Sequence, residues 1–353
     1  MRLLVVKRDK LGDLLLTRPV LDRARALAPD AEIHLLANDY NAWVASDHPA
    51  ITRTWVYPRV RSDGRVHPLA LLRQIPLGYQ LRRQHFDWAF VMGGDESHRA
   101  IRRAVRTGAH RVVAYARERR RYGRGLTDSF APPHEGHEVA RMLALLAPLA
   151  QSQPATGVDL AIGDAAPTFD VSAAATEFAS QWLRERELPP RGYIVIGLGA
   201  RRAKKQPTPA QVARWSTRVF ELHGIATVLM WTPGTSTNPA YPGDDELAQA
   251  VLDQRLSHVH PFRGPIEPAL GLIFAARTSV IPDSGLMHFA AASPGGVVGL
   301  FADPLDSAPA SRWAPLGARA RYIEAPKRIA DVSDDDVFAE LAPLLESVTA
   351  DRY

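Results

Sequence analysis

Short apolar segments alternate with helical patterns along most of this chain, and this alternation limits its fold more than any other feature. In the first half the apolar segments are RLLVVK (2–7), EIHLLA (32–37), ITRTWVY (51–57), FDWAFVM (86–92) and HRVVAYA (110–116). In the second half they are YIVIGLG (193–199), IATVLMW (225–231), LSHVHPF (256–262), SVIPD (279–283) and GGVVGLFA (295–302), with helical patterns at 209–223, 244–254, 267–277 and 285–293. Strands that alternate with helices form βαβ units and a largely parallel sheet. The sequence therefore predicts an α/β protein with two doubly wound halves joined near residues 165–172.

The chain contains no cysteine, which excludes disulfides, thiolate metal sites and cysteine nucleophiles. Near its start, the charged residues from Lys7 to Lys10 interrupt the apolar run, so this segment is typical of a strand and not of a signal sequence. No run approaches the ~20 apolar residues that a membrane-spanning helix needs. We therefore expect a soluble, cytoplasmic protein.

The net charge of +5 is unevenly distributed. Residues 1–165 carry 25 Lys and Arg against 17 Asp and Glu, whereas residues 166–353 carry 18 against 21. Most of these cations are arginines, at positions 59, 61, 65, 82, 83, 102, 103 and 106 and in RERRRYGR (117–124). Arginine suits bidentate contact with phosphate or carboxylate, so the first half is predicted to meet an anionic partner. A solvated basic surface is the alternative.

The stretch VIPDSGLMHFAAAS (280–293) runs from a strand through a Ser-Gly turn into a helix. Backbone N–H groups at Ser284 and Gly285 would lie at the amino end of that helix, where an anion such as phosphate is favoured. The alternative is an ordinary N-cap at Asp283 or Ser284 with a packed His288.

Two further turns follow strands in the same way. In VVKRDKLGDLLLTRP (5–19), Asp13 lies in the first helical turn, where it would accept a proton from a substrate hydroxyl or simply cap the helix. In GLGARRAKKQPTPAQVARW (197–215), Lys204 and Lys205 would neutralise a diphosphate, or else be solvent-exposed loop lysines.

Together these stretches resemble a known family. The shared pattern comprises Gly12, Asp13, Thr17, Pro19 and Val20, a Gly-Ala-x(n)-Lys loop at 199–205, and Asp-Ser-Gly-x2-His-x-Ala-Ala at 283–291 followed by VVGLFADP. Weaker similarity extends through FDWAFVMGG (86–94) and HEVARMLALLAPL (137–149). The chain is similar over roughly residues 1–305 to the ADP-heptose:lipopolysaccharide heptosyltransferases, glycosyltransferase family 9. This resemblance implies a GT-B fold, in which two Rossmann-like domains with parallel sheets face a central cleft, and an inverting sugar transfer that requires no metal or other cofactor.

The resemblance also assigns roles by position. Asp13 matches the catalytic base. The donor diphosphate would be bound by Ser284, Gly285, Met287 and His288, together with Lys204 or Lys205. The Lys-Lys-Gln-Pro at 204–207 replaces the family's Lys-x-Trp-Pro, so either lysine fits the phosphate role. The segment TPGTSTNPAYPGDDELAQ (232–249) is longer than in the family, and its candidates for the donor ribose are Asp244, Asp245 and Glu246. Acceptor contacts are expected from Lys7, Arg8, Arg59, Arg61 and Arg120.

The resemblance further implies direct displacement of a nucleotide diphosphate from ADP-heptose by an anionic inner-core lipopolysaccharide acceptor. We expect peripheral contact with the cytoplasmic face of the inner membrane, and no nucleic-acid partner. A heptosyltransferase that modifies protein and a GT-B-like nucleotide-sugar epimerase are the alternatives. The expected domains are an acceptor domain (1–168), a donor domain (172–330) and a C-terminal helix within 331–353. That helix, predicted over 334–348, either crosses back to the first domain or packs on the second.

Overall fold

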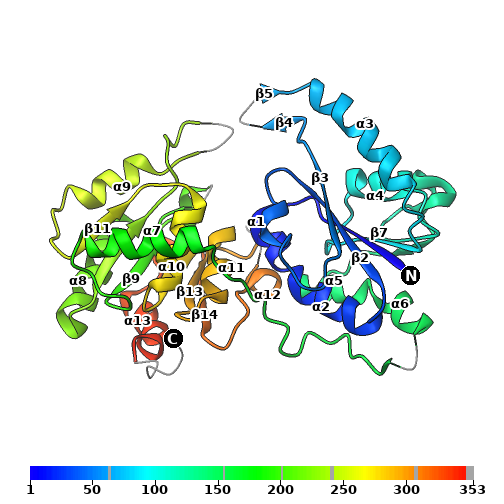
Figure 1. The fold of residues 1–353 in the computed structure, drawn as a ribbon. Coiled ribbons are helices and arrows are strands. Elements are labelled where there is room, and N and C mark those ends of the chain that lie inside the picture. The colour runs from blue at the N-terminus through cyan, green and yellow to red at the C-terminus, as the bar shows by residue number, and fades with distance from the viewer. Residues whose placement is uncertain (63–64, 154–155, 200–201, 239–241, 306–308, 347–353) are drawn as a thin grey trace. The chain divides into compact units, whose positions relative to one another are not determined.

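A computed structural model describes residues 1–62, 65–153, 156–199, 202–238, 242–305 and 309–346 (Figure 1). The chain divides into two compact units, Met1–Thr168 and Phe169–Tyr353. The division falls inside the junction that the sequence predicts at 165–172. Each unit is described below by itself.

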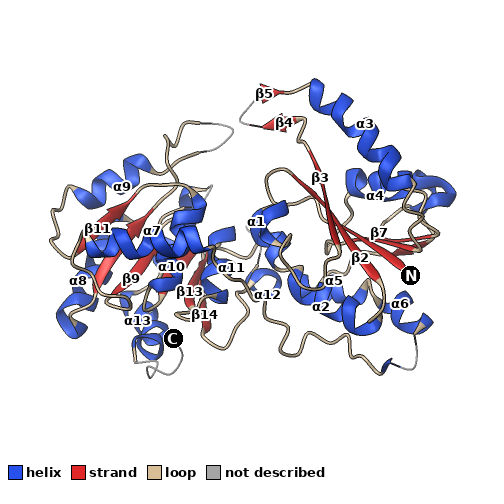
Figure 2. Ribbon diagram, viewed as in Figure 1, coloured by secondary structure: helices blue, strands red, loops and turns tan. Residues whose placement is uncertain are grey.

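The N-terminal unit contains a six-stranded sheet in which every pair of neighbouring strands is parallel (Figure 2). Its strands are β1 (Arg2–Val6), β2 (Glu32–Asn38), β3 (Arg53–Tyr57), β6 (Trp88–Val91), β7 (Arg111–Tyr115) and β8 (Asp128–Phe130). The strand order is β3-β2-β1-β6-β7-β8, with Leu3 of β1 opposite Ile33 of β2 on one side and Trp88 of β6 on the other. Buried on both faces, β1 consists of a continuous apolar run after its first residue, as parallel strands usually do.

Helices cover both faces of this sheet. They are α1 (Leu11–Leu15), α2 (Arg18–Leu27), α3 (Leu69–Arg82), α4 (His98–Arg106), α5 (Glu138–Ala144) and α6 (Ala147–Ser152), with 3-10 turns η1 (Ala42–Val44) and η2 (Arg119–Gly125). Leu4 and Val6 of β1 belong to a buried cluster that includes residues of α3 and α4. Side chains alternate along a strand, and Lys7 accordingly reaches Met142 of α5 on the other face. A short antiparallel hairpin, β4 (Arg61–Ser62) and β5 (Arg65–Val66), precedes α3.

The C-terminal unit repeats the same strand order. Its strands are β9 (Tyr193–Gly197), β10 (Ala226–Met230), β11 (Val259–Phe262), β12 (Ser279–Pro282), β13 (Val297–Phe301) and β14 (Ala320–Glu324), arranged as β11-β10-β9-β12-β13-β14 and parallel throughout. In both sheets the first strand along the chain is central and the order reverses beside it. This is the doubly wound order of Rossmann-like folds, in which ligands bind at the carboxyl ends of the strands.

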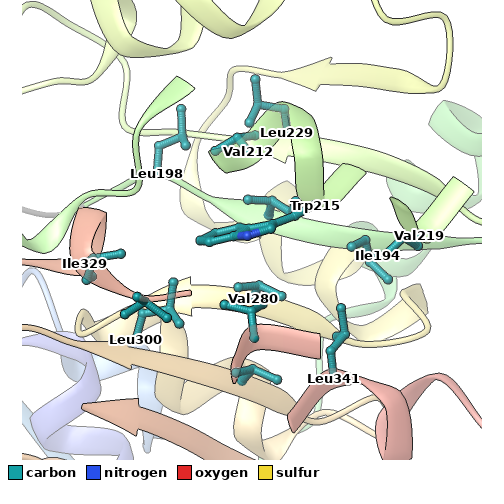
Figure 3. Packing of buried hydrophobic residues seen from close by; sticks show 14 of the residues in the cluster. Ile194, Leu198, Val212, Trp215, Val219, Leu229, Val280, Leu300, Ile329 and Leu341 are labelled. Carbon is teal, nitrogen blue, oxygen red and sulfur yellow. The ribbon is translucent and has the colours of Figure 1, made fainter. Parts of the chain in front are cut away.

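The helices of this unit form a layer on each face of its sheet. They are α7 (Ala173–Arg184), α8 (Pro209–His223), α9 (Asp245–Leu252), α10 (Ile266–Ala275), α11 (Gly285–Ala292), α12 (Ala310–Trp313) and α13 (Asp334–Leu345), with 3-10 turns η4 (Ala203–Lys205) and η5 (Ile329–Asp331). Figure 3 shows Trp215 of α8 among buried residues of the strands and of α13, including Val280 and Leu341. On the opposite face, the Tyr193 hydroxyl donates to the Leu272 carbonyl of α10 at 2.6 Å.

Helix α13 packs on the C-terminal unit. Its five buried apolar residues, Val337, Phe338, Leu341, Leu344 and Leu345, all belong to that unit's core cluster. The Ser333 hydroxyl caps the helix by accepting from Asp336 N at 3.1 Å. The apolar face of this helix completes the core of the C-terminal unit beside α8.

The helices α8 and α3 differ in how well local sequence accounts for them. Thr208 caps α8 in a capping box with Gln211, and Gly224 ends it in the left-handed conformation at φ 65°. Helix α3 has neither signal and contains Pro76. Among the described residues, no helix is both long and apolar enough to cross a membrane.

Candidate active site

Asp13 lies in the short helix α1, which follows the carboxyl end of β1 after a loop of residues 7–10. Its Oδ2 accepts a hydrogen bond from Lys10 N at 3.0 Å, and the Thr17 hydroxyl donates to its backbone carbonyl at 2.9 Å. The side chain thus caps α1, yet it remains partly exposed. Both roles expected from the sequence are compatible with this geometry, because a carboxylate that accepts one backbone bond retains further acceptor positions.

Lys7 is buried beside this carboxylate, with only 1% of its surface exposed. Its Nζ lies 3.4 Å from Asp9 Oδ2 and 3.7 Å from Met142 Sδ. Burial by itself lowers the pKa of Lys7, but nearby carboxylates outweigh it and hold the pKa above the ordinary value; in order of effect they are Asp9, Asp13 and Glu138. Lys7 is therefore a buried residue that carries a positive charge next to Asp13.

The pKa of Asp13 is raised above its ordinary value. Burial is the largest cause, and the neighbouring carboxylates of Asp9 and Glu138 add to it. The Lys7 ammonium and the bond from Lys10 N oppose this shift. The position of Asp13 in the first turn of a helix favours the ionised group. The burial of α1 changes that balance and makes Asp13 a stronger base than an exposed aspartate.

Two buried charged residues of α5 join this group to the turn after β6. Glu138 Oε1 accepts from Gly94 N at 2.6 Å. Arg141 donates to three backbone carbonyls, those of Gly94 (3.3 Å), Gly136 (2.9 Å) and His134 (3.0 Å). Position 94 has no room for a side chain, since a Cβ there would lie 2.4 Å from Glu138 Oε2 and 2.6 Å from Arg141 Cδ. The turn and the start of α5 are therefore closely packed next to Asp13.

A cavity of about 810 Å³ also lies within the N-terminal unit. Residues of α3, α4 and the strand ends line it. Six arginines contribute to its wall, and they are Arg8, Arg59, Arg99, Arg102, Arg103 and Arg106. Arg103 stacks on the Tyr57 ring at 3.7 Å, and burial lowers its pKa, with a further lowering by Arg8 and Arg106. No aspartate or glutamate is among the lining residues that the structure describes. The cavity is therefore suited to a group with several negative charges.

The five residues predicted to contact the acceptor lie in different parts of the N-terminal unit. Arg8 and Arg59 line the arginine cavity, and Arg59 also pairs with Asp39 at 2.8 Å. Lys7 belongs to the Asp13 cluster. Arg120 is exposed in η2, and Arg61 lies in β4 with its side chain outside the described residues.

In the C-terminal unit, the turn after β12 brings together three parts of the predicted donor site. The Lys205 ammonium forms an ion pair with the Asp283 carboxylate, in the residue directly before Ser284. Ser284 is the extended N-cap of α11, and its side chain makes no capping bond. Gly285 begins the helix, whose first N–H groups have no partner within the helix. The ion pair thus holds Lys205 next to the amino end of α11, with the Asp283 carboxylate balancing its charge.

Met287 and His288 are both buried. Met287 packs over β13, where a Cβ at Gly299 would lie 2.6 Å from its Sδ. Lys204 lies in the same 3-10 turn as Lys205.

The three acidic candidates for the ribose accept hydrogen bonds from the backbone of residues 232, 234 and 236. Asp244 is buried and accepts from Thr232 N at 3.1 Å and from Gln206 Nε2. Burial raises the pKa of Asp244 to about 6, although both hydrogen bonds oppose the shift. Asp245 accepts from Arg263 at 2.8 and 3.0 Å and from Trp231 Nε1 at 2.8 Å.

Glu246 is the exposed member of these three candidates, and it accepts from Ser236 N at 3.1 Å. Gln206, which stands where the family has a tryptophan, has a defined role because it bonds Asp244. Among the described residues, no cluster of His, Asp or Glu side chains has the arrangement of a metal site.

Sequence reasoning missed Asp9, Glu138, Arg141 and Arg99. Their segments were recognised, but nothing in a single sequence shows that α5 returns to the end of β1. Lys7 and Met142 are separated by 135 residues.

Comparison with solved structures finds the same fold in three bacterial proteins. A glycosyl transferase family 9 protein from Veillonella parvula aligns with a TM-score of 0.78 and 16% identity, covering 98% of this chain and 97% of that chain. The E. coli ADP-heptose lps heptosyltransferase II gives 0.71 and 22%, covering 98% of each chain. E. coli heptosyltransferase WaaC with ADP gives 0.70 and 19%, covering 98% of this chain and 100% of that one. The predicted GT-B-type α/β fold with two parallel sheets is therefore confirmed.

Comparison with curated protein sequences finds no match. Comparison with protein families, in contrast, matches residues 75–339 to glycosyltransferase family 9 (heptosyltransferase). The match spans most of both units, including the Gly94 turn, α5 and the amino end of α11. The chain therefore belongs to glycosyltransferase family 9, the heptosyltransferase family, and is a glycosyltransferase.

Proposed function

We propose that this glycosyltransferase moves a heptose from ADP-heptose to an anionic inner-core lipopolysaccharide acceptor, with inversion at the anomeric carbon. The observation that carries the proposal is the Asp13 cluster. It combines a partly exposed carboxylate of raised pKa with a buried ammonium at the carboxyl end of a central strand. A base of this kind is matched to a sugar hydroxyl, which loses its proton only as it attacks.

In the proposed reaction, Asp13 takes the proton of the acceptor hydroxyl while that oxygen forms a bond to the anomeric carbon. The bond between this carbon and the β-phosphate oxygen breaks, and ADP leaves with the electron pair. Lys7 keeps its charge throughout, which balances the carboxylates around it. No covalent intermediate is required, because attack and departure occur on opposite faces of the sugar.

Negative charge develops on the departing diphosphate, and the C-terminal unit offers positive groups for it. We assign this role to Lys205 with the backbone N–H groups at Ser284 and Gly285, which the Lys205–Asp283 pair brings together. Lys204, Met287 and His288 complete the proposed donor site. Of the ribose candidates, Glu246 is the exposed carboxylate, whereas Asp244 and Asp245 hold the surrounding segment.

For the acceptor, we assign the carboxylates and phosphates of the inner core to the arginine cavity. Six guanidinium groups and no carboxylate among its described lining residues favour a ligand with several negative charges. The lipid portion of such an acceptor lies in a membrane, so we also propose peripheral contact with the cytoplasmic face of the inner membrane.

The test is Asp13→Asn, which keeps the shape of the side chain and its bond from Lys10 N but removes the base. Turnover of ADP-heptose with a lipopolysaccharide acceptor should fall by about 10²–10⁴-fold, while ADP binding and thermal stability stay close to wild type. An equal loss of stability and activity would reduce Asp13 to a helix cap.

Product analysis distinguishes the alternatives. Transfer to a polypeptide serine in place of the glycolipid would indicate a protein-modifying heptosyltransferase. An epimerised nucleotide sugar formed without any acceptor would indicate an epimerase.

A further inference from the structure

Helix α3 exposes a continuous apolar stripe. Leu69, Leu72, Ile75 and Tyr79 are each between 61% and 67% exposed, and Pro76 lies among them. At about 100° per residue, these five positions fall within an arc of about 120°. No charged residue of α3 falls within that arc, since Arg73 and Arg82 lie outside it.

The opposite side of α3 is the one that packs on the protein. Ala70 and Leu81 are buried there, and the Gln74 amide donates to the Pro58 carbonyl at 2.8 Å. The helix is therefore apolar both where it meets the core and where it meets solvent. A helix that is apolar all round is normally covered on all sides, so its outer stripe indicates an interaction surface.

The surroundings of α3 are strongly basic. Leu71, Ile75 and Leu81 of α3 line the arginine cavity, and four arginines of α4 line the same cavity. In Figure 1, α3 and α4 belong to the same part of the N-terminal unit. An apolar stripe bordered by arginines is the composition of surfaces that lie in the interface of an anionic membrane.

We propose that the outer stripe of α3 inserts into the headgroup region of an anionic lipid bilayer, with the arginines of the cavity at the level of the lipid phosphates. A second copy of the chain is disfavoured as the occupant, because pairing two such surfaces would bring two arginine clusters together. The proposal deepens the proposed function, on which it rests for the nature of the acceptor. The cavity would receive the anionic head of an acceptor that remains in the bilayer.

The first test measures vesicle binding by the full chain, without donor or turnover. Wild type should co-sediment with vesicles of phosphatidylcholine and phosphatidylglycerol, bind pure phosphatidylcholine much less, and dissociate as salt is raised. The variant Leu69→Gln, Leu72→Gln, Tyr79→Gln should partition at least about tenfold less. The control Leu222→Gln removes a leucine of similar exposure, 63%, from α8 and should bind as wild type does. Absence of wild-type binding, or equal binding by the triple variant, would overturn the proposal.

The second test locates the contact. Because the chain has no cysteine, Leu72→Cys and Leu222→Cys can each carry one environment-sensitive fluorophore. Anionic vesicles should shift the emission to the blue at position 72 alone. Equal shifts at both positions, or none at position 72, would contradict the proposal. So would a dimer seen without lipid by light scattering and lost in the triple variant.

A turnover assay separates this inference from the proposed function. The triple variant should transfer sugar to an acceptor lacking acyl chains at the wild-type rate, and slow down only on acceptor embedded in vesicles. Wild-type rates on both substrates would reject the docking surface while leaving the sugar transfer intact. Vesicle binding without any sugar transfer would reject the proposed function alone.

Discussion

Replacing Gly94 by alanine should destabilise the N-terminal unit, because the added methyl group has no room. It would lie 2.4 Å from Glu138 Oε2 and 2.6 Å from Arg141 Cδ, and real Cβ atoms essentially never come within 3.0 Å of a neighbour. Both neighbouring side chains are buried and held by hydrogen bonds. They can make room only by giving up some of those bonds.

The size of the effect follows from the bonds at risk. Moving the Glu138 carboxylate breaks its bond from Gly94 N, a bond to a charged group worth about 1.5–3 kcal/mol. Displacing Arg141 weakens one carbonyl contact by about 1 kcal/mol. Alanine restricts the unfolded chain, which offsets about 0.4–1 kcal/mol. The free energy of unfolding should therefore fall by about 2–3 kcal/mol, and the urea midpoint by about 1 M.

Urea unfolding, monitored by hydrogen exchange of peptides from β6 and α5, would measure this loss of stability in the N-terminal unit. Gly78→Ala is the matched control, since a Cβ there meets nothing within 4 Å and the position lies inside α3. It should stabilise the protein by about 0.5–1 kcal/mol. If both variants are stabilised, Glu138 and Arg141 are free to move, and the packing argument for the Asp13 cluster is wrong.

Three further predictions follow from charged groups. Asp244 has a folded-state pKa of about 6, above its unfolded value, so the folded state binds its proton more tightly. This residue therefore lowers the free energy of unfolding as pH rises from about 4 to 6, by up to about 3 kcal/mol. In Asp244→Asn this pH dependence should vanish, and a stability difference between wild type and variant that is the same at about pH 4 and about pH 6 would refute the assignment. Asp334→Ala should lower the stability measured by thermal unfolding by about 1–2 kcal/mol, because it removes hydrogen bonds from Arg214 and Trp215. The side chain of Asp335 is 89% exposed, so the control Asp335→Ala should change stability by less than about 0.5 kcal/mol. Similar losses in both variants would contradict a special role for Asp334. Lys205→Gln should weaken ADP binding, measured by calorimetry, by about tenfold, and the control Arg184→Gln on α7 should leave it unchanged. If Lys205→Gln binds ADP nearly as wild type does, another cation contacts the phosphates.

The sequence predicted most strands because most of them contain a short apolar run. Ten of the fourteen described strands coincide with apolar segments, whereas β4, β5, β8 and β14 were missed. β4 and β5 have only two residues each, too few to form a recognisable pattern. β8 has three residues, Asp-Ser-Phe, and β14 is a partly exposed edge strand with charged residues, so neither shows the apolar run of a buried strand. Helix α3 was missed for a different reason. Its apolar residues occur on every side, so no helical period stands out.

The residues of the candidate site likewise fall into those that the sequence could indicate and those that it could not. Asp13, Ser284 and Lys205 could be chosen as candidates because each lies in a segment that follows a strand of a parallel sheet, where ligands bind in doubly wound folds. Glu138 and Arg141 could not, since their importance arises from contacts with a turn 44 and 47 residues earlier. The raised pKa of Asp13 could likewise not be predicted from the sequence, because it depends on how deeply α1 is buried.

The central position of β1 has a consequence for synthesis on the ribosome. β1 is made first, but one of its two neighbours, β6, is made much later, and the bond from Arg2 N to Asp87 spans 85 residues. At about 5–20 residues per second, that edge of β1 stays open for roughly 4–17 s. An apolar strand with an unpaired edge readily pairs with another nascent chain. Translation speed over residues 1–90, and chaperones that bind this segment, should therefore control how much of the protein is recovered in native form.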